Sequence, residues 1–405
     1  MKLSPAPDPA RPAAAASPLA AFGLPLLRLG FRPFYLGAAL FAALAVPLWV
    51  AVYLGYLAFT PSSTVSALLW HAHEMLFGFA AAVIMGFLLT AVKAWTGLQT
   101  PRGPLLGALV LLWLAARMAA VVGPYPLYAV LDLALLPLVA IALARLLLRA
   151  GNRRNLPLAL LLMLLALANL GFHLAVTGLV PLAPVRPLHA GLALIVMVEC
   201  VIAGRVVPAF MASATPGLKL MAHPHLEPAT LALTALGLAL WVFASTGWLA
   251  LGVLLLAAAL QLRRQWGWRP LRARGRPILW ILQAAYAWIP LGLALLALAQ
   301  VQLLPASAGV HALAVGATGG LIIGMITRTA RGHTGRPLVV STPEVLAYLL
   351  VLLAAVLRVG LPLLAPGLLV PALLGAALAW SAAFAIYLVM YTPWLMQARL
   401  DDKDG

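Results

Sequence analysis

The chain has 405 residues, of which 64% are hydrophobic and only 9% are charged. A soluble domain carries about 25% charged residues, so this composition excludes an ordinary globular protein and indicates that the lipid bilayer is the solvent. The formal net charge of +17 would suit a nucleic-acid partner. The basic residues are instead spread between apolar runs, which is the pattern of membrane topology, and we expect no nucleic-acid binding.

Apolar segments recur along nearly the whole chain, and each has the roughly 20 residues that a helix needs to cross ~30 Å of hydrocarbon. Strands of a membrane barrel would be shorter and would alternate polar with apolar residues. The sequence therefore predicts an all-α polytopic membrane protein with about twelve transmembrane helices. In chain order the expected helices are residues 31–58, 66–92, 104–122, 125–149, 156–179, 186–211, 228–246, 247–264, 277–300, 307–329, 343–365 and 367–393.

The positive charges alternate between the two sides of these helices. If the N-terminus is cytoplasmic, every one of the 26 lysines and arginines falls on the cytoplasmic side except Arg117, Arg186 and Arg358. Cytoplasmic loops of membrane proteins carry such an excess of basic residues. Both termini are therefore predicted to be cytoplasmic.

The domain organisation is simple. Residues 1–22 are predicted to form a disordered cytoplasmic tail, because they are rich in Ala and Pro. They lack the continuous apolar stretch behind basic residues that is typical of a cleaved signal peptide, so none is expected. A single membrane domain is expected at 23–396 and a cytoplasmic C-terminal tail at 397–405. The one cysteine, Cys200, excludes an internal disulfide, and no nucleotide-binding loop or haem-attachment motif is present.

An internal repeat is suggested by three helices with similar beginnings. His71-Ala72, His189-Ala190 and His311-Ala312 open the second, sixth and tenth helices, and a glycine follows each histidine by thirteen to fifteen residues. The chain would then consist of three four-helix repeats, at 23–150, 151–268 and 269–396. Chance similarity among helices rich in Ala, Leu and Gly is the alternative.

Five of the eight histidines are predicted to lie in one layer, within ~10 Å of the outer membrane boundary. Neutral imidazole is a common ligand of haem iron and copper, and bundle cofactors are held by side chains from facing helices. The sequence therefore predicts a haem or metal site. The alternative is that each imidazole binds a carbonyl or a lipid headgroup at the interface. The five are His71, His73, His173, His189 and His311.

The helical phase divides the two histidines of the second helix. At 100° per residue His71 and Glu74 share one face with Gly78, whereas His73 points almost oppositely. A single planar cofactor on one face cannot bind both histidines. One is expected to ligate it while the other binds a second metal or faces the headgroups.

Several charged residues need an explanation of their own. Glu74 is predicted to orient an imidazole or to carry protons, with an interfacial carboxylate as the alternative. Glu199, near mid-membrane, is a candidate for a proton path. Arg117 and Asp132 are predicted to pair structurally.

His333 lies on the predicted cytoplasmic side. It is a candidate to ligate a second metal, or to bind an anion together with Arg328 and Arg336. The alternative is a loop histidine that caps a helix end, and the positive-inside rule already explains the arginines.

Five motifs resemble the NnrS family. They are FRPF (31–34), WHAHEMLFGFAAAVIMGFLLTA (70–91), WTG (95–97), GRVVP (204–208) and HALAVGATGGLIIGMITRTARGHTGRPL (311–338). The resemblance implies a bacterial inner-membrane protein that contains haem and copper and acts in the nitric-oxide response and in resistance to nitrosative stress, often alongside denitrification. One departure is Ala94, where the family often has Asn.

The predicted architecture is also similar to the catalytic subunit of haem–copper oxidases, which has twelve helices in three units and histidines on the second, sixth and tenth. This chain has one histidine on the tenth helix and none on the seventh. A complete set of low-spin haem, high-spin haem and copper is therefore not expected, and the likeness is an analogy of architecture.

These observations lead to an expected set of haem and copper ligands and to two rival functions. We expect His71 or His73, with His311, to be axial ligands of a b-type haem, and His189, with His173, to bind copper or a second haem. Nitric oxide would reach the site from the lipid, and an electron donor would be a partner. Whether the protein is a nitric-oxide-handling oxidoreductase stays open. The rivals are a metal or small-solute transporter that uses the histidines as pathway ligands, and a cytochrome-like electron carrier.

Overall fold

The computed structural model describes residues 23–57, 65–218, 220, 225–244 and 247–401. These residues form twelve long helices and no β-strand, so the predicted fold class is confirmed. The helices are α1 (Phe31–Tyr53), α2–η3–α3 (Ala67–His73, Glu74–Ala80, Ala81–Thr96), α4 (Pro104–Val122), α5 (Tyr125–Arg149), α6 (Leu156–Val176), α7 (Val185–Ala214), α8 (Leu226–Phe243), α9 (Trp248–Gly267), α10–α11 (Pro277–Tyr286, Trp288–Gln300), α12–η6–α13 (Ala306–His311, Ala312–Gly319, Gly320–His333), α14 (Thr342–Leu364) and α15 (Leu369–Met396).

Eleven of these helices in the described chain are long and apolar enough to cross a membrane. The twelfth, α9, has 20 residues, but its last turns contain Gln261, Arg263 and Arg264, which lower its apolarity. The seventh and eighth expected helices are separate helices, because α8 ends at Phe243 and α9 begins at Trp248. The tail predicted at residues 1–22 lies outside the described residues, and the division into three repeats remains a prediction.

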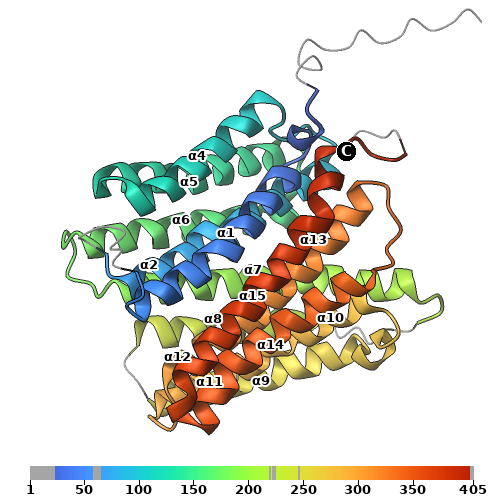
Figure 1. Ribbon diagram of the computed structural model, residues 1–405. Coiled ribbons are helices and arrows are strands. Elements are labelled where there is room, and N and C mark those ends of the chain that lie inside the picture. Colours follow the sequence, from blue (N-terminus) through green and yellow to red (C-terminus); the bar gives the residue numbers. More distant parts are fainter. Residues whose placement is uncertain (1–22, 58–64, 219, 221–224, 245–246, 402–405) are drawn as a thin grey trace, which may run out of the picture.

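The first and last helices pack together and close the bundle. Figure 1 shows α1 running beside α15, with α4 to α6 on one flank and α9 to α11 on the other. The Arg32 guanidinium, at the start of α1, donates hydrogen bonds to the carbonyls of Leu395 (2.9 Å) and Gln397 (2.7 Å) at the end of α15. The start of α1 and the last turn of α15 therefore lie at the same end of the bundle, which we call the terminal end.

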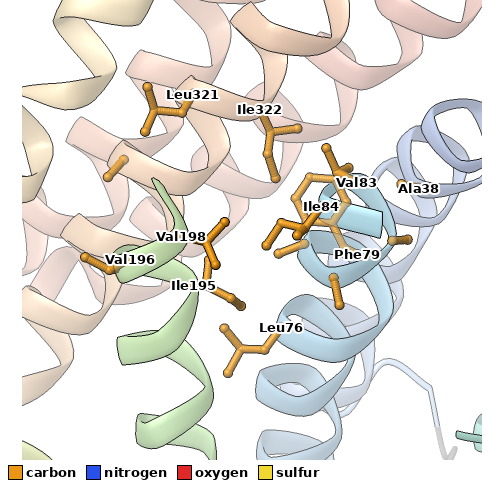
Figure 2. Close-up of a cluster of buried hydrophobic side chains, with 14 of the residues drawn as sticks. Ala38, Leu76, Phe79, Val83, Ile84, Ile195, Val196, Val198, Leu321 and Ile322 are labelled. Carbon is orange, nitrogen blue, oxygen red and sulfur yellow. The ribbon is translucent and has the colours of Figure 1, made fainter. Parts of the chain in front are cut away.

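The histidine-bearing helices form the interior of the bundle. The apolar windows of α2–η3–α3 and α12–η6–α13 are 78% and 72% buried, more than those of the other spans in the described chain. Helix α7 contacts both η3 and η6. Figure 2 shows apolar side chains from these three helices converging, among them Leu76, Phe79, Ile195 and Ile322. A cofactor between these helices would therefore be shielded from lipid and water.

Small residues let one inner helix approach its neighbour closely. A Cβ atom added to Gly316 would lie 2.3 Å from the Trp288 ring, and one added to Gly320 would lie 2.6 Å from Ala285. Glycine is common at such contacts because it lets two helices approach backbone to backbone. This face of α12–η6–α13 is therefore the packing surface for α10–α11.

The loop before α14 is fixed by a capping box formed by Ser341 and Glu344. The Glu344 carboxylate accepts a hydrogen bond from the Ser341 amide at 2.6 Å. Arg331 at the end of α13 donates to both oxygens of the same carboxylate, at 2.7 and 2.6 Å. This bidentate ion pair joins α13 to α14 at the terminal end.

Candidate functional site

The five histidines predicted in one layer lie in two separate groups, at the end of the bundle away from the terminal end. His71, His189 and His311 line one cavity. His73 and His173 belong to a buried polar network, where their ring centroids are 5.4 Å apart. The two histidines of α2 therefore face different surroundings, as the helical phase predicted.

The cavity, which we call the histidine cavity, has a volume of about 360 Å³. Ligand pockets in proteins span roughly 300–1,000 Å³ and are mostly apolar, with a few polar groups that orient the ligand. This cavity follows that pattern, because its walls are largely apolar side chains such as Met75, Phe79 and Leu192. The polar side chains on its wall are His71, His189, Ser307, His311, Thr318 and Arg358, together with the indoles of Trp49 and Trp380.

Two of the cavity histidines are held by aromatic stacking. The His71 ring lies 4.0 Å from the Trp49 ring with an interplanar angle of 18°, and the His189 ring lies 4.4 Å from the Trp241 ring at 28°. Within the described chain, the buried Nδ1 of His71 has no hydrogen-bond partner. Stacking fixes these ring planes without occupying the ring nitrogens, which leaves nitrogen lone pairs for a ligand.

The third cavity histidine is oriented by the backbone. His311 Nδ1 lies 2.7 Å from the Ser307 carbonyl oxygen. A carbonyl only accepts hydrogen bonds, so Nδ1 carries the proton and Nε2 keeps its lone pair. Metal-bound histidines show this arrangement, with one ring nitrogen on a carbonyl or carboxylate and the other on the metal.

A single cation completes the cavity. Arg358 of α14 lines it, and no carboxylate of the described residues lies within ion-pair distance of this guanidinium. An uncompensated charge in an apolar site is costly. The Arg358 position therefore favours a ligand with an anionic group.

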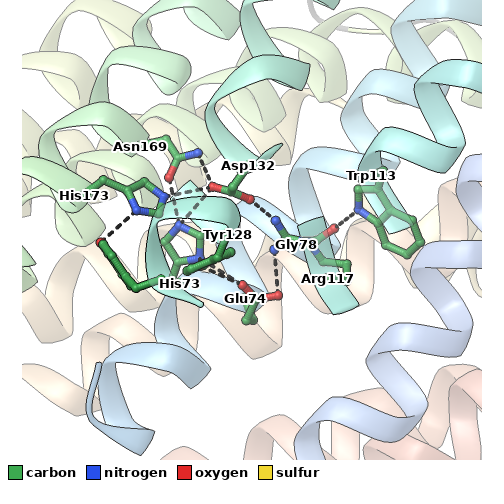
Figure 3. Close-up of polar contacts among 10 residues, drawn as sticks. His73, Glu74, Gly78, Trp113, Arg117, Tyr128, Asp132, Asn169 and His173 are labelled. Atoms are coloured by element: carbon green, nitrogen blue, oxygen red, sulfur yellow. Dashed lines mark hydrogen bonds and ion pairs between the residues drawn. The ribbon is translucent and has the colours of Figure 1, made fainter. Parts of the chain in front are cut away.

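The second group of histidines is part of a dense polar network, drawn in Figure 3. Arg117 of α4 donates to Glu74 Oε2 at 2.6 Å and to Asp132 Oδ1. Asn169 Nδ2 of α6 donates to Asp132 Oδ2 at 2.6 Å. The predicted pair of Arg117 and Asp132 is thus present, and Glu74 extends it.

Both imidazoles of the network point one nitrogen at Asp132. Oδ2 of Asp132 lies 3.2 Å from His173 Nε2 and 3.4 Å from His73 Nε2, and His73 Nε2 makes its hydrogen bond with Asn169 Oδ1, at 2.8 Å. The opposite nitrogen of each ring is held by a phenol: His73 Nδ1 lies 2.8 Å from Tyr128 Oη, and His173 Nδ1 lies 2.9 Å from Tyr125 Oη. Two imidazoles and one carboxylate, with polar partners behind them, form a donor set that suits a first-row transition metal.

The charges of the network do not cancel. Glu74 and Asp132 supply two negative charges and Arg117 one positive charge, and all three side chains are at most 4% exposed. With both imidazoles neutral, a net charge of about −1 would be buried, which is unfavourable. A bound cation or a proton on an imidazole balances it.

The partner of Glu74 differs from the expected one. The helical phase placed Glu74 with His71, but its carboxylate contacts His73, Tyr128 and Arg117. The guanidinium attracts the carboxylate to this side, and Gly78 makes room for the ion pair. A Cβ atom at Gly78 would lie 2.8 Å from Arg117 Nη1.

Two of the inner helices contain a π-helical segment that begins directly after a histidine. The π-helical segment η3 begins after His73, and η6 begins after His311. Single π-helical turns are rare and are often found at functional sites. No periodic feature of the sequence indicated them, because one wide turn leaves the apolar character of a span unchanged.

The remaining predicted residues lie elsewhere. Glu199 lines a smaller cavity deeper in the bundle. His333 ends α13 at the terminal end, with its ring 5.4 Å from that of Phe31. Arg328 stacks on Phe210 at 3.6 Å and Arg336 on Trp394 at 4.4 Å, and an anion site that these two arginines form with His333 stays a prediction.

Sequence reasoning missed several residues of the site. Trp49, Trp241 and Arg358 reach the histidines from other helices, which only the packing reveals. Tyr125, Tyr128 and Asn169 carried a usable signal, since each is a polar residue in an otherwise apolar span near a predicted histidine depth.

The fold is that of a polytopic helical membrane protein, and its buried His73–Asp132–His173 group is compatible with metal binding. The family model described as NnrS protein matches residues 25–399, nearly the whole chain. The chain therefore belongs to the NnrS family, as its motifs indicated. No curated protein matches the chain.

Proposed function

We propose that this protein binds haem in the histidine cavity and copper at the His73–Asp132–His173 network, and binds or redox-handles nitric oxide there. The observation that carries the proposal is the meeting of three imidazoles, from the three inner helices, in one apolar cavity. NnrS family membership supports a role in the nitric-oxide response. We place the protein in the bacterial inner membrane, with both termini cytoplasmic and the histidines near the periplasmic side.

The cavity residues fit a haem group. His71 and His311 would hold the haem iron, because one has an unpartnered buried nitrogen and the other has its Nδ1 fixed on a carbonyl. Arg358 would pair with an acidic substituent of the macrocycle, and His189 would be a third nitrogen donor. When bound, haem supplies an iron that coordinates nitric oxide and exchanges single electrons.

The other cavity residues control access. Phe79 and Met75 on the cavity wall exclude water, while a small uncharged gas enters from the lipid through apolar packing. Trp49 and Trp241 keep the imidazole planes fixed, so the ligand nitrogens need little reorganisation on loading.

The polar network fits a copper ion. His73, His173 and Asp132 offer one ligand atom each, all within 4.8 Å of one another. Tyr128, Glu74 and Tyr125 hold the far sides of the rings, and the network's unbalanced negative charge favours a cation. Imidazole and carboxylate donors suit Cu(II), which binds such sites more tightly than other divalent first-row metals.

The haem proposal is tested on protein purified in detergent. The visible spectrum and the haem and iron contents are measured for the wild type, His71→Ala, His311→Ala and a control, His225→Ala, whose side chain is exposed at the start of α8. We expect each ligand variant to lose most of its bound haem and the control to keep it. Full haem retention in both ligand variants would refute the ligand assignment.

The copper proposal needs a separate readout. His73→Ala and His173→Ala should lower bound copper at least about tenfold, the scale of losing a metal-site partner, while haem content stays near that of the wild type. Copper that is unchanged in both variants, or lost only together with haem, contradicts two independent sites.

The rival functions make different predictions. Wild-type protein without a Soret band and without iron would favour a metal or small-solute transporter, and flux into proteoliposomes would then be measured. If haem is present, a Soret shift on adding nitric oxide to the reduced protein supports nitric-oxide binding. Consumption of nitric oxide with an artificial electron donor distinguishes an oxidoreductase from an electron carrier.

A further inference from the structure

A second, smaller cavity lies deeper in the bundle, between α1, α3, α7, α10 and α12–η6–α13. Its volume is about 70 Å³. Most of its wall is apolar, including Val83, Ile84, Leu321 and Ile322, whose side chains are visible in Figure 2. Three oxygen-bearing side chains also line it: Tyr35 from α1, Glu199 from α7 and Thr318 from η6.

These oxygens have polar neighbours, Thr318 beside Glu199 and Thr329 beside Tyr35, but none of these contacts has the distance and angles of a hydrogen bond. Glu199 Oε2, Thr318 Oγ1 and Tyr35 Oη are buried, and none has a hydrogen bond within the described residues. Buried polar groups in native proteins almost always bond to protein or to ordered water. One water needs only about 10–15 Å³ and two to four polar partners, so this cavity has the room and the partners for water that links the three groups.

Thr318 connects the two cavities. Its side chain lines the histidine cavity as well as the smaller one. Glu199 is the only carboxyl group among the described residues that line either cavity. With water supplying the missing hydrogen bonds, a route from an acid to the histidine cavity can therefore run from Glu199 through Thr318.

A row of phenols continues from the smaller cavity toward the terminal end. Tyr387 of α15 is a neighbour of Tyr35, and its ring stacks on that of Tyr391 at 4.5 Å. The Tyr391 hydroxyl donates to the Glu344 carboxylate at the start of α14. Hydroxyl groups thus extend from Glu344 at the terminal end to the cavity that contains Glu199.

We infer that Glu199 is the proton-exchanging group of the histidine cavity. The Glu199 carboxylate would take up one proton from water, forming an O–H bond, whenever a one-electron donor reduced a redox centre held in that cavity. Oxidation returns the electron to an acceptor and the proton to water. The inference rests on the proposed function, because it requires a redox centre in the histidine cavity.

Electrostatics gives the direction of the coupling. An electron added to a site of low dielectric lowers the local potential, and the protonated form of a nearby carboxyl is then favoured. The charged and titratable groups around Glu199 are few. Tyr35 faces it from α1 and Arg358 lies across the histidine cavity, while Arg264 bonds to the Cys200 carbonyl on the other side of α7.

Redox titration of the loaded protein at a series of pH values tests the inference. In the wild type the midpoint potential of the haem should fall as pH rises, because reduction takes up a proton. In Glu199→Gln this slope should be lost while the haem content and absorption spectrum stay unchanged. Cys200→Ala is the matched control: it lies at the same depth, its sulfur contacts Gln261 rather than the cavity, and it should keep the slope.

A second readout does not depend on potentials. The infrared difference spectrum between reduced and oxidised protein should contain a protonated-carboxyl band that is absent in Glu199→Gln and shifted in Glu199→Asp. Thr318→Val should keep the band but slow its appearance at least tenfold, because it removes the connecting hydroxyl.

The outcomes separate this inference from the proposed function. Wild-type protein that carries no redox centre overturns both. Bound haem with an unchanged pH slope and carboxyl band in Glu199→Gln overturns only the role of Glu199.

Discussion

The charged side chains around Arg117 are buried and paired with one another. One guanidinium holds two carboxylates, Glu74 and Asp132, in a region with almost no solvent. Removing one member of a buried ion pair is far more harmful than replacing the whole pair, since the remaining charge loses its compensation.

Arg117→Ala is therefore expected to destabilise the protein by about 3–5 kcal/mol. Thermal unfolding in detergent measures the loss. Adding Glu74→Gln to this variant should recover part of it, because one unpaired carboxylate disappears. Arg263→Ala, an exposed arginine of α9, is the control and should change stability by less than about 0.5 kcal/mol. An Arg117→Ala variant as stable as this control would contradict the charge analysis.

Arg358 should behave in the opposite way in the unloaded protein. Because it has no carboxylate partner among the described residues, Arg358→Leu should stabilise the apoprotein. The same variant should bind haem about tenfold more weakly, the worth of a charge-assisted hydrogen bond. Apoprotein melting and haem titration measure the two effects, and an unchanged haem affinity would show that this arginine does not contact the ligand.

At the scale of the helices, the sequence predicted most boundaries and little of the local geometry. Helix ends followed from hydropathy and from turn residues, since leaving the membrane requires polar groups or glycine. The start of α4 at Pro104 and the end of α5 at Arg149 match the expected positions. The π-helical turns were missed because they alter hydrogen bonding rather than composition.

Helix packing was predictable only where it depends on small residues. The glycines of η6 and α13 leave space at the helix surface, and α10–α11 fills it. The partners of His73 were not predictable, because Tyr128 and Asn169 lie 55 and 96 residues away in the chain. The contacts between separate helices depend on how each helix is rotated about its own axis, and an apolar sequence does not determine this rotation.

Gly78→Ala tests the contact between η3 and the buried ion pairs of Arg117. The new methyl group would clash with Arg117 and with the Glu74 carboxylate, so the variant should lose stability and bound copper. Gly252→Ala in α9 is a matched control, because a Cβ atom there meets nothing within 4 Å. The control should be neutral or stabilised by up to about 1 kcal/mol. Equal melting temperatures for both variants would refute the predicted clash.

At the scale of the molecule, each helix runs from one end of the bundle to the other, so successive loops lie at alternate ends. Residue 150 follows α5, residue 177 follows α6, and the two loops are therefore at opposite ends of the bundle. The positive-inside pattern assigns the first loop to the cytoplasm, which the fold alone does not determine.

Cysteine labelling tests this orientation. In a Cys200→Ala background, which has no cysteine, Thr177→Cys should react with a membrane-impermeant maleimide on whole cells. Ala150→Cys should react only after the membrane is opened; both side chains are exposed. The reverse pattern would place the termini outside and the histidines near the cytoplasm.

The contact between α1 and α15 also affects biogenesis. The ribosome delivers α1 to the membrane first. The hydrogen bonds from Arg32 to the Leu395 carbonyl and from the Trp380 indole to the Ala42 carbonyl form only when the last helix emerges. Helix α1 therefore lacks its contacts with α15 until the entire chain has been synthesised. Nascent chains that stop before α15 should therefore be recognised as unfinished and degraded by membrane proteases.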